Sequence, residues 1–171
     1  MNKIIAAVLG LGALTVASAT SIRTPITFVD VFDPSPDIKM CGCSIQSYSF
    51  VHDIRDNGFD TWSNFILNSR LVLTLEDDID VSSETVRIKF DDIVQQENME
   101  VDAGPYSFIV QSAFLQTDGK LKVSLRAKSG DFWFRKSELT VNAEAIPEPT
   151  TFAMLGLGLL GLGLVSRRKK K

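Results

Sequence analysis

The sequence YSFIVQSAFLQTDGKLKVSL, residues Tyr106–Leu125, carries the strongest fold signal in this chain. Alternate positions on both sides of Asp118-Gly119 are apolar: Tyr106, Phe108, Val110 and Phe114 before it, and Leu121, Val123 and Leu125 after it. A period of two predicts β-strands with one buried face. Because an Asp-Gly dipeptide supports a type I′ turn, the stretch predicts a β-hairpin.

The same alternation recurs on either side of this stretch. It predicts further strands at Ser47–Asp53, Arg70–Leu75, Glu84–Phe90, Phe132–Phe134 and Leu139–Ala143. No segment between Thr20 and Ala145 has sustained helical periodicity. The sequence therefore predicts an all-β domain, residues 20–145, folded as a single jelly-roll-like β-sandwich. Its first part, residues 20–45, contains Pro25, Pro34 and Pro36 and is predicted to be a loose arm or an edge strand.

The amino terminus has the pattern of a secretory signal peptide. Lys3 is followed by an uncharged, mostly apolar run from Ile4 to Val16 and by Ala17-Ser18-Ala19, with small residues at the two positions that signal peptidase reads. We expect residues 1–19 to be removed after Ala19. The protein is therefore predicted to be exported.

The carboxyl terminus has the pattern of a membrane segment. Pro147 and Pro149 prevent a helix from beginning before about Thr150. Residues 151–166 carry no charge and span roughly 24 Å as a helix, slightly less than a hydrocarbon core of about 30 Å. The basic residues 167–171 favour a cytoplasmic end, so the domain lies outside the membrane.

Residues 146–171 resemble the PEP-CTERM tail of exported bacterial envelope proteins. The resemblance implies that Pro147, Glu148 and Pro149 form the recognition motif of a membrane-embedded exosortase. It also implies that the helix and a basic end beginning Arg167-Arg168 hold the protein in the inner membrane. After processing, such proteins reach the cell surface or the extracellular matrix of bacteria that make exopolysaccharide. The Tyr-Ser-Phe-x-His-Asp sequence at residues 48–53 also resembles the β-sandwich ectodomains that often precede these tails.

The predicted domain is acidic. Between Thr20 and Pro147 the sequence has 12 Lys and Arg against 20 Asp and Glu, and 12 − 20 = −8. Nucleic acids and anionic lipids require a basic surface, so this charge argues against both and favours cations as ligands.

Two acidic loops are candidates for a calcium site. The predicted ligands are Asp53, Asp56, Asp60, Asp77, Asp78 and Asp80. Ca²⁺ prefers six to eight oxygen ligands and tolerates irregular geometry, although the spacing does not match an EF-hand. The alternative is that these residues are there because turns favour Asp, Asn and Gly.

Cys41, Cys43 and His52 have a second set of possible roles. The cysteines can oxidise in an exported protein, either with each other, which is a strained pairing, or between chains. With His52 they offer three ligands for zinc but no evident fourth. His52 is the only histidine, and its strand pattern favours a packed, hydrogen-bonded side chain over a Ser-His-Asp catalytic set.

The residues support two hypotheses for function. The first is a non-catalytic binding or structural module that associates with exopolysaccharide or the envelope, with Trp62 and Trp133 stacking on sugar rings. Phe132 and Phe134 can also stack, but their alternation favours the core. The second is a small exported polysaccharide-active enzyme that uses acidic loop residues.

Overall fold

The computed structural model describes residues 25–42, 44–77 and 82–146, which form two antiparallel β-sheets. Sheet A has the strand order β1 (Pro25–Phe32), β9 (Asp131–Ala145), β4 (Asn64–Asp77) and β7 (Gly104–Val110), and β2 (Ile38–Cys41) also pairs with β9. Sheet B has the order β3 (Ser47–Asp53), β8 (Lys120–Ser129), β5 (Thr85–Phe90) and β6 (Ile93–Glu100). The short helices η1 (Ile54–Asn57) and α1 (Ser112–Leu115) lie between strands.

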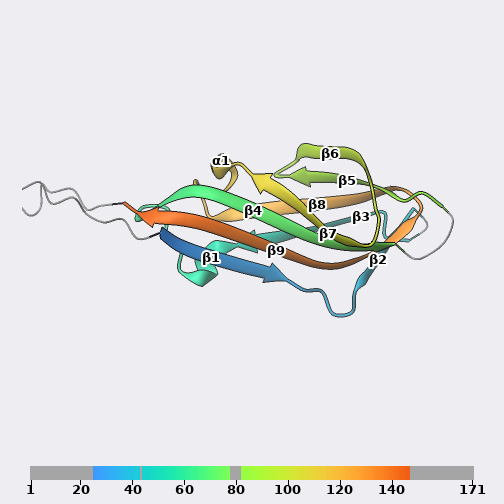
Figure 1. Ribbon diagram of the computed structural model, residues 1–171, viewed down its shortest axis with the longest axis horizontal. Helices are drawn as coiled ribbons and strands as arrows, with labels where there is room; N and C mark the ends of the chain where they lie inside the picture. The colour runs from blue at the N-terminus through green and yellow to red at the C-terminus, as the bar shows by residue number, and fades with distance from the viewer. Residues whose placement is uncertain (1–24, 43, 78–81, 147–171) are drawn as a thin grey trace, which may run out of the picture.

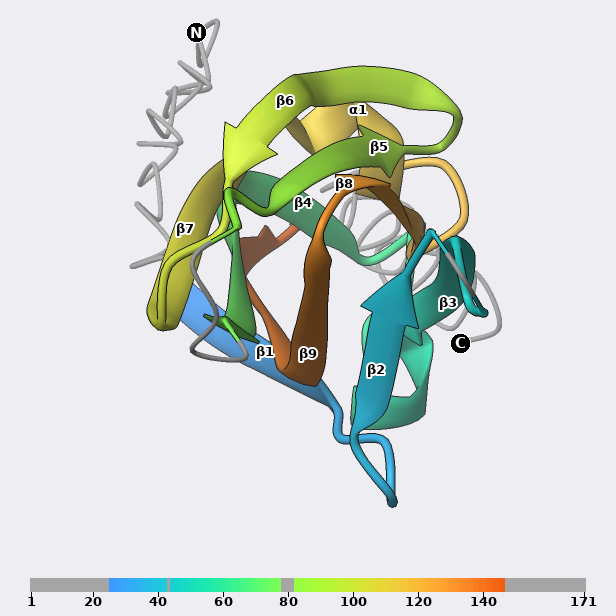
Figure 2. The ribbon, with the colours of Figure 1, turned by 90° about the vertical axis from the view of Figure 1, so that its right-hand side faces the viewer.

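The sheets lie face to face, and their strands run along the longest axis of the domain (Figure 1). A view along that axis shows the strands of both sheets enclosing the core (Figure 2). The first long strand pairs with the last, and the chain passes repeatedly between the sheets. The prediction of an all-β domain is confirmed, with its strands in two antiparallel sheets.

The predicted apolar faces form the core between the sheets. The alternating sets Leu71, Leu73, Leu75 and Val86, Ile88, Phe90 and Leu121, Val123, Leu125 are all almost completely buried. Phe50, Phe32 and Phe134 form a mutually stacked aromatic group, with the Phe50 centroid 4.5 Å from Phe32 and 5.1 Å from Phe134 and the other two 6.1 Å apart. Phe132 and Phe134 are fully buried, so they belong to the core and not to a sugar-binding surface.

The predicted hairpin across Asp118-Gly119 was wrong. β7 pairs with β4 in sheet A, whereas β8 pairs with β3 and β5 in sheet B. The chain crosses between the sheets through α1, which buries Leu115, and the amide of Gly119 donates to the carbonyl of Leu115 at 2.7 Å. Gly119 has the positive φ of 70° that was expected, but it closes this helical turn and does not join two paired strands.

Two further predictions need correction. The predicted strands Phe132–Phe134 and Leu139–Ala143 are parts of the single strand β9. An irregularity in the pairing with β4 leaves Arg135 without an opposite residue, which moves the buried face from even to odd positions. Within the predicted arm, residues 25–32 form β1 at the edge of sheet A, so the edge-strand alternative is correct there and the loose arm is not.

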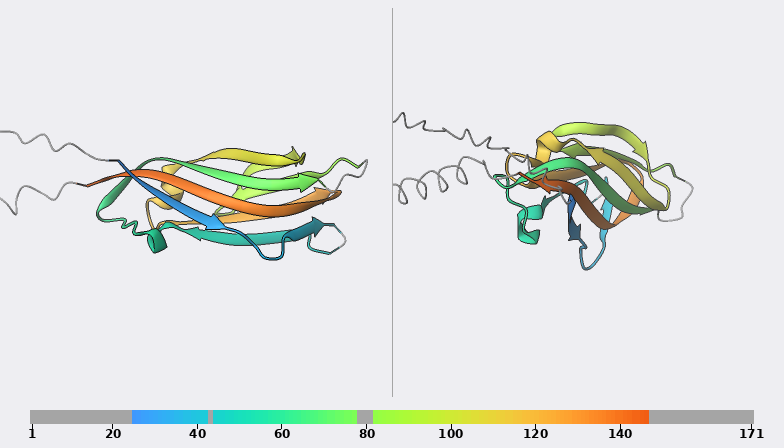
Figure 3. Two further views of the ribbon diagram at one scale, coloured as in Figure 1. Left: turned by 60° about the horizontal axis from the view of Figure 1, so that its bottom comes forward. Right: turned by 60° about the vertical axis from the view of Figure 1, so that its left-hand side comes forward.

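Several predictions fall on residues outside those described. They include the signal peptide, residues 1–19 with Ala17 and Ala19, and the helix at residues 151–166 with Arg167 and Arg168. No helix within the described part of the chain has the length and apolarity needed to cross a membrane. Figure 3 shows the start of β1, in blue, and the end of β9, in orange, at the same end of the sandwich.

Candidate functional site

The outer face of sheet B carries a concentration of positive charge. In β8 the odd positions are buried, which turns the side chains of Lys120, Lys122, Ser124, Arg126 and Lys128 outward. In β5 the buried side chains likewise leave Arg87 and Lys89 on the outer face. A protein domain with a net charge of −8 therefore presents one basic face.

The strand register brings these cations side by side. Arg126 of β8 lies opposite Ser47 of β3 on one side and opposite Arg87 of β5 on the other. In the next row Ser124 lies between Ser49 and Lys89, and Ser49 donates a hydrogen bond of 2.8 Å to Ser124. Like charges on directly opposed residues such as Arg87 and Arg126 destabilise a sheet, so an anion placed between them relieves repulsion.

These side chains line a shallow hollow of about 250 Å³, which we call the basic hollow. Its lining residues are Ser47, Ser49, Arg87, Lys89, Asp92, Lys122, Ser124, Leu125 and Arg126. Four cations and one carboxylate give the lining a formal charge of 4 − 1 = +3. Three serine hydroxyls add uncharged donors and acceptors.

Ion pairs neutralise only some of this charge. Arg87 pairs with Glu97, which lowers the pKa of the Glu97 carboxyl, and Lys122 pairs with the exposed Asp92 at 3.3 Å. Arg126 and Lys89 have no ion-pair partner among the described residues. The Nε–H of Arg87 is buried and finds no acceptor among the described residues, but it is shielded from solvent, so Lys89 and Arg126 supply the accessible donors. The basic hollow thus retains donors that are available to an anionic ligand.

The sequence reasoning missed the basic hollow because it used the net charge of the whole domain. A signal was nevertheless present in the alternation of the sequence. The apolar residues Leu121, Val123 and Leu125 occupy odd positions, and the basic residues occupy the even positions around them: Lys120, Lys122, Arg126 and Lys128. Their outward direction follows from the alternation. The adjacent position of Arg87 and Lys89 does not, because it depends on β5 pairing with β8.

A second hollow, of about 300 Å³, lies on the outer face of sheet A. It is lined by Asn68, Arg70, Thr140 and Asn142. Thr27 donates to Asn142 and Asn142 donates to Asn68, each at 2.8 Å, so the amides are largely engaged with one another. Arg70 is the single cation among the residues that line this hollow. It is therefore a suitable control position for substitutions of the arginines on sheet B.

The predicted calcium ligands do not come together in one site. Asp53 and Asp60 lie near the start of β4, whereas Asp77 ends that strand about 40 Å away. Asp78 and Asp80 are outside the described residues. Across residues 25–42, 44–77 and 82–146, no group of three His, Cys, Asp or Glu side chains could hold a metal ion.

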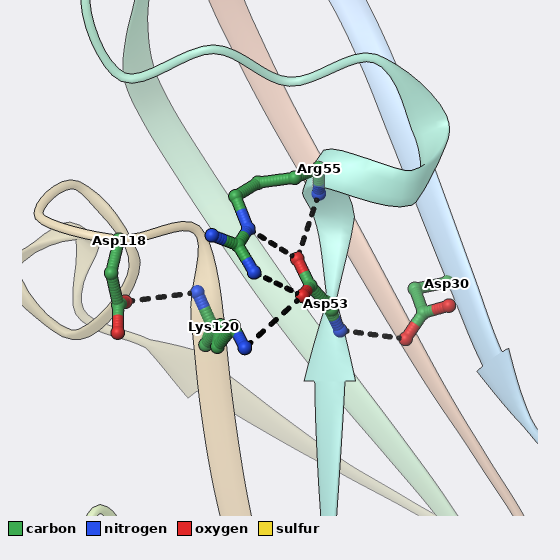
Figure 4. A network of polar contacts seen from close by, with 5 residues as sticks. All are labelled: Asp30, Asp53, Arg55, Asp118 and Lys120. Atoms are coloured by element: carbon green, nitrogen blue, oxygen red, sulfur yellow. Dashed lines mark hydrogen bonds and ion pairs between the residues drawn. The ribbon is translucent and has the colours of Figure 1, made fainter.

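The carboxylate of Asp53 is instead committed to two cations (Figure 4). It accepts hydrogen bonds from Arg55 at 2.6 and 2.8 Å and pairs with Lys120 at 3.4 Å. Arg55 thereby holds the pKa of the Asp53 carboxyl well below its usual range. The Asp60 carboxylate closes its own turn, accepting from the amide of Trp62 and the hydroxyl of Ser63, and these bonds lower its pKa. The Asp53 and Asp60 side chains thus behave as turn and ion-pair residues.

His52 is fully buried and connects the two sheets. Its Nδ1 is 2.7 Å from the Asp30 carboxylate on β1, and its Nε2 is 2.8 Å from the Ser137 hydroxyl on β9. In the neutral ring, Nδ1 donates to Asp30 and Nε2 accepts from Ser137. Burial lowers the pKa of His52, against the opposing effect of Asp30.

The Ser137-His52-Asp30 chain has the connectivity of a catalytic triad. Both Ser137 and His52 have no solvent-exposed surface, so a substrate has no access to the hydroxyl. The arrangement agrees with a packed, hydrogen-bonded histidine. It also engages both ring nitrogens, which leaves His52 unable to join Cys41 in a zinc site.

The remaining predicted residues lie apart from the basic hollow. Cys41 is disulfide-bonded, and Cys43 is outside the described residues. Trp62 is 88% exposed in the turn before β4. Trp133 is near the other end of the domain, where the cationic groups of Arg135 and Lys39 lie 5.5 and 5.9 Å from its ring. The two tryptophans therefore do not form one sugar-stacking platform.

The geometry defines a two-sheet antiparallel β domain with a basic hollow on one outer face. Comparison with protein families adds a sorting signal, because residues 145–169 match the PEP-CTERM protein-sorting motif. The chain thus carries a PEP-CTERM motif downstream of a β-rich domain. The motif implies an exported surface protein that is anchored in the membrane and then processed by an exosortase.

No curated protein has a significant sequence match to this chain. Among solved structures, dimeric latent PorU from Porphyromonas gingivalis aligns with a TM-score of 0.40 and 8% identity, covering 71% of this chain and 13% of that one. A family two carbohydrate esterase from Cellvibrio japonicus aligns with a TM-score of 0.33 and 15% identity, covering 74% of this chain and 36% of the esterase. The chain therefore spans well under half the length of these structures. TM-scores this low support no inference about function.

Proposed function

We propose that this protein is a non-catalytic surface module that binds an acidic polysaccharide through the basic hollow of sheet B. One observation carries the proposal: an acidic domain collects Arg87, Lys89, Lys122 and Arg126 around a hollow on a single sheet face. Separating charge in this way has an electrostatic cost that a bound polyanion offsets.

The sorting motif supports a polymer of the cell envelope as the ligand. An exported surface protein meets exopolysaccharide, and uronic acid residues supply carboxylates at regular spacing along such a chain. A shallow hollow of about 250 Å³ is smaller than the enclosed pockets of roughly 300–1,000 Å³ that bind drug-sized ligands. It suits a polymer that lies across the strands and makes repeated charge-assisted hydrogen bonds.

The non-catalytic role is part of this proposal. Glycoside hydrolysis usually requires two facing carboxylates, and Asp92 is the one carboxylate among the residues that line the basic hollow. The buried Ser137 and His52 cannot meet a polymer. Both observations favour binding over the alternative of a polysaccharide-active enzyme.

The test measures binding of the full chain, in detergent, to immobilised polygalacturonate and to uncharged dextran. We expect binding to polygalacturonate that weakens as salt is added, and little binding to dextran. The double substitution Lys89→Gln and Arg126→Gln should weaken binding about tenfold, which corresponds to about 1.4 kcal/mol.

The matched control is Arg70→Gln, which removes one arginine from the outer face of sheet A and should leave the affinity unchanged. Equal binding to dextran, or an unchanged affinity in the double variant, would contradict the proposal. Release of reducing sugar from the polymer would favour the enzyme instead.

A further inference from the structure

A cluster of exposed apolar side chains lies at the end of the domain from which the chain continues into the sorting motif. Its members, which we call the tail-end cluster, are Ile26, Trp62, Phe65, Leu67 and Ile146. They come from the start of β1, the turn before β4, the start of β4 and the residue after β9. The strand register places Ile26 opposite the buried Ala143 and Phe65 opposite Glu144, so these two side chains lie on opposite faces of sheet A at the end of β9 and flank the exit of the chain from both sides.

A backbone hydrogen bond fixes the exit of the chain beside Trp62. The amide of Ile146 donates to the carbonyl of Ser63 at 2.7 Å. In the sequence, the apolar run of the tail begins at Phe152, six residues after Ile146. Six residues span at most about 20–22 Å, so Ile146, which is hydrogen-bonded to the residue next to Trp62, stays within that distance of the point where the tail enters a bilayer.

The turn that carries Trp62 is held by its own hydrogen bonds. Asp60 accepts from the amide of Trp62 at 3.1 Å and from the hydroxyl of Ser63 at 2.8 Å, and its carbonyl accepts from the amide of Asn64 at 2.8 Å. An ordered turn thus presents a large aromatic ring that makes little contact with the domain. Tryptophan in such a position favours the interface between lipid and water, where its ring is sheltered and its N–H stays hydrated.

We propose that Trp62 and the tail-end cluster dock the domain onto the lipid interface while the tail is inserted in the membrane. Charges of both signs flank the cluster, since Glu144 lies opposite Phe65 and η1, shortly before Trp62 in the chain, carries both Arg55 and Asp56, so attraction to anionic lipid does not drive the contact. The driving force is burial of apolar surface, and zwitterionic lipid suffices. Docking holds the residues after Ile146 at the bilayer surface until the chain is processed.

The test uses the two tryptophans of the chain as separate reporters. Trp133→Phe leaves Trp62 as the single tryptophan, and Trp62→Phe leaves Trp133, which lies 12 residues along β9 from Ala145, about 40 Å away. Each full-length variant is reconstituted at a low protein-to-lipid ratio in phosphatidylcholine vesicles. Only the fraction that floats with the vesicles is measured, and circular dichroism confirms that both variants are folded.

Trp62 in vesicles is expected to emit at shorter wavelength than free tryptophan in water and to be quenched by lipids brominated near the headgroup. Trp133, the matched control, should keep its emission and should not be quenched by any brominated lipid. The proposal would be overturned if brominated lipid did not quench the emission of Trp62 and aqueous iodide did. A blue shift that follows protein concentration, without quenching by lipid, would also overturn it, because it would assign the cluster to a second copy of the chain.

Discussion

Acidification between pH 7.5 and 5.5 should lower the free energy of unfolding, and His52 should account for the change. The chain has one histidine, so no other side chain has an ordinary pKa inside this range once Cys41 is disulfide-bonded. In the unfolded chain the imidazole titrates near pH 6.5. In the folded domain burial lowers the pKa of His52. Below pH 6.5 the unfolded state therefore binds one more proton than the folded state, and stability is lost as the pH falls.

The size of the effect has an upper limit. If His52 stays neutral in the folded domain down to pH 5.5, the free energy of unfolding falls by at most about 1.4 kcal/mol from its value at pH 7.5. Urea unfolding followed by circular dichroism at several pH values measures it. The variant His52→Gln keeps a polar side chain without this titration, so its stability should be almost constant over the same range.

Two results would refute this reasoning. A stability that rises on acidification would mean that the Asp30 carboxylate, 2.7 Å from Nδ1, outweighs burial and raises the pKa. A parent-like slope in His52→Gln would mean that another group titrates.

Two further predictions concern packing and backbone. Leu73→Ala, at a fully buried position of β4, should lower the free energy of unfolding by about 2–5 kcal/mol in urea titrations, and a loss below 1 kcal/mol would show that the core collapses around the site. Gly119→Ala places a Cβ 2.8 Å from the Cγ of Arg55, on a residue whose φ is 70°. The free energy of unfolding should therefore fall by about 1–2 kcal/mol, as measured by thermal unfolding. An unchanged melting temperature would show that the substitution causes no strain in the crossing after α1.

The local alternation of the sequence predicted which faces are buried, because that pattern depends only on a residue's neighbours along the chain. Ser47–Asp53 is a strand with the predicted bounds, and Leu71, Leu73 and Leu75 share the predicted buried face. The prediction was wrong where the parity changes inside a strand. Arg135 lies at a bulge in β9, and its effect on the alternation made one strand look like two.

Strand pairing was harder to predict than strand position. The Asp118-Gly119 dipeptide does adopt a turn, but the choice between a hairpin and a crossing depends on α1 burying Leu115 between the sheets. β6, with the sequence IVQQENME, was missed because it is an edge strand whose residues are exposed or half-buried on both faces. The basic hollow depends on the pairing of β5 with β8, so a count of charges along the chain could not have found it.

The position of β9 within sheet A has a mechanical consequence. The sorting motif continues from the end of this strand, and β9 is bonded on one side to β1 and β2 and on the other to β4 over nearly its whole length. The ladder bonds of antiparallel strands are perpendicular to the strands. A pull on the tail therefore loads many hydrogen bonds at once in shear and does not peel them open one by one. The domain can bear tension through its carboxyl end without unravelling from it.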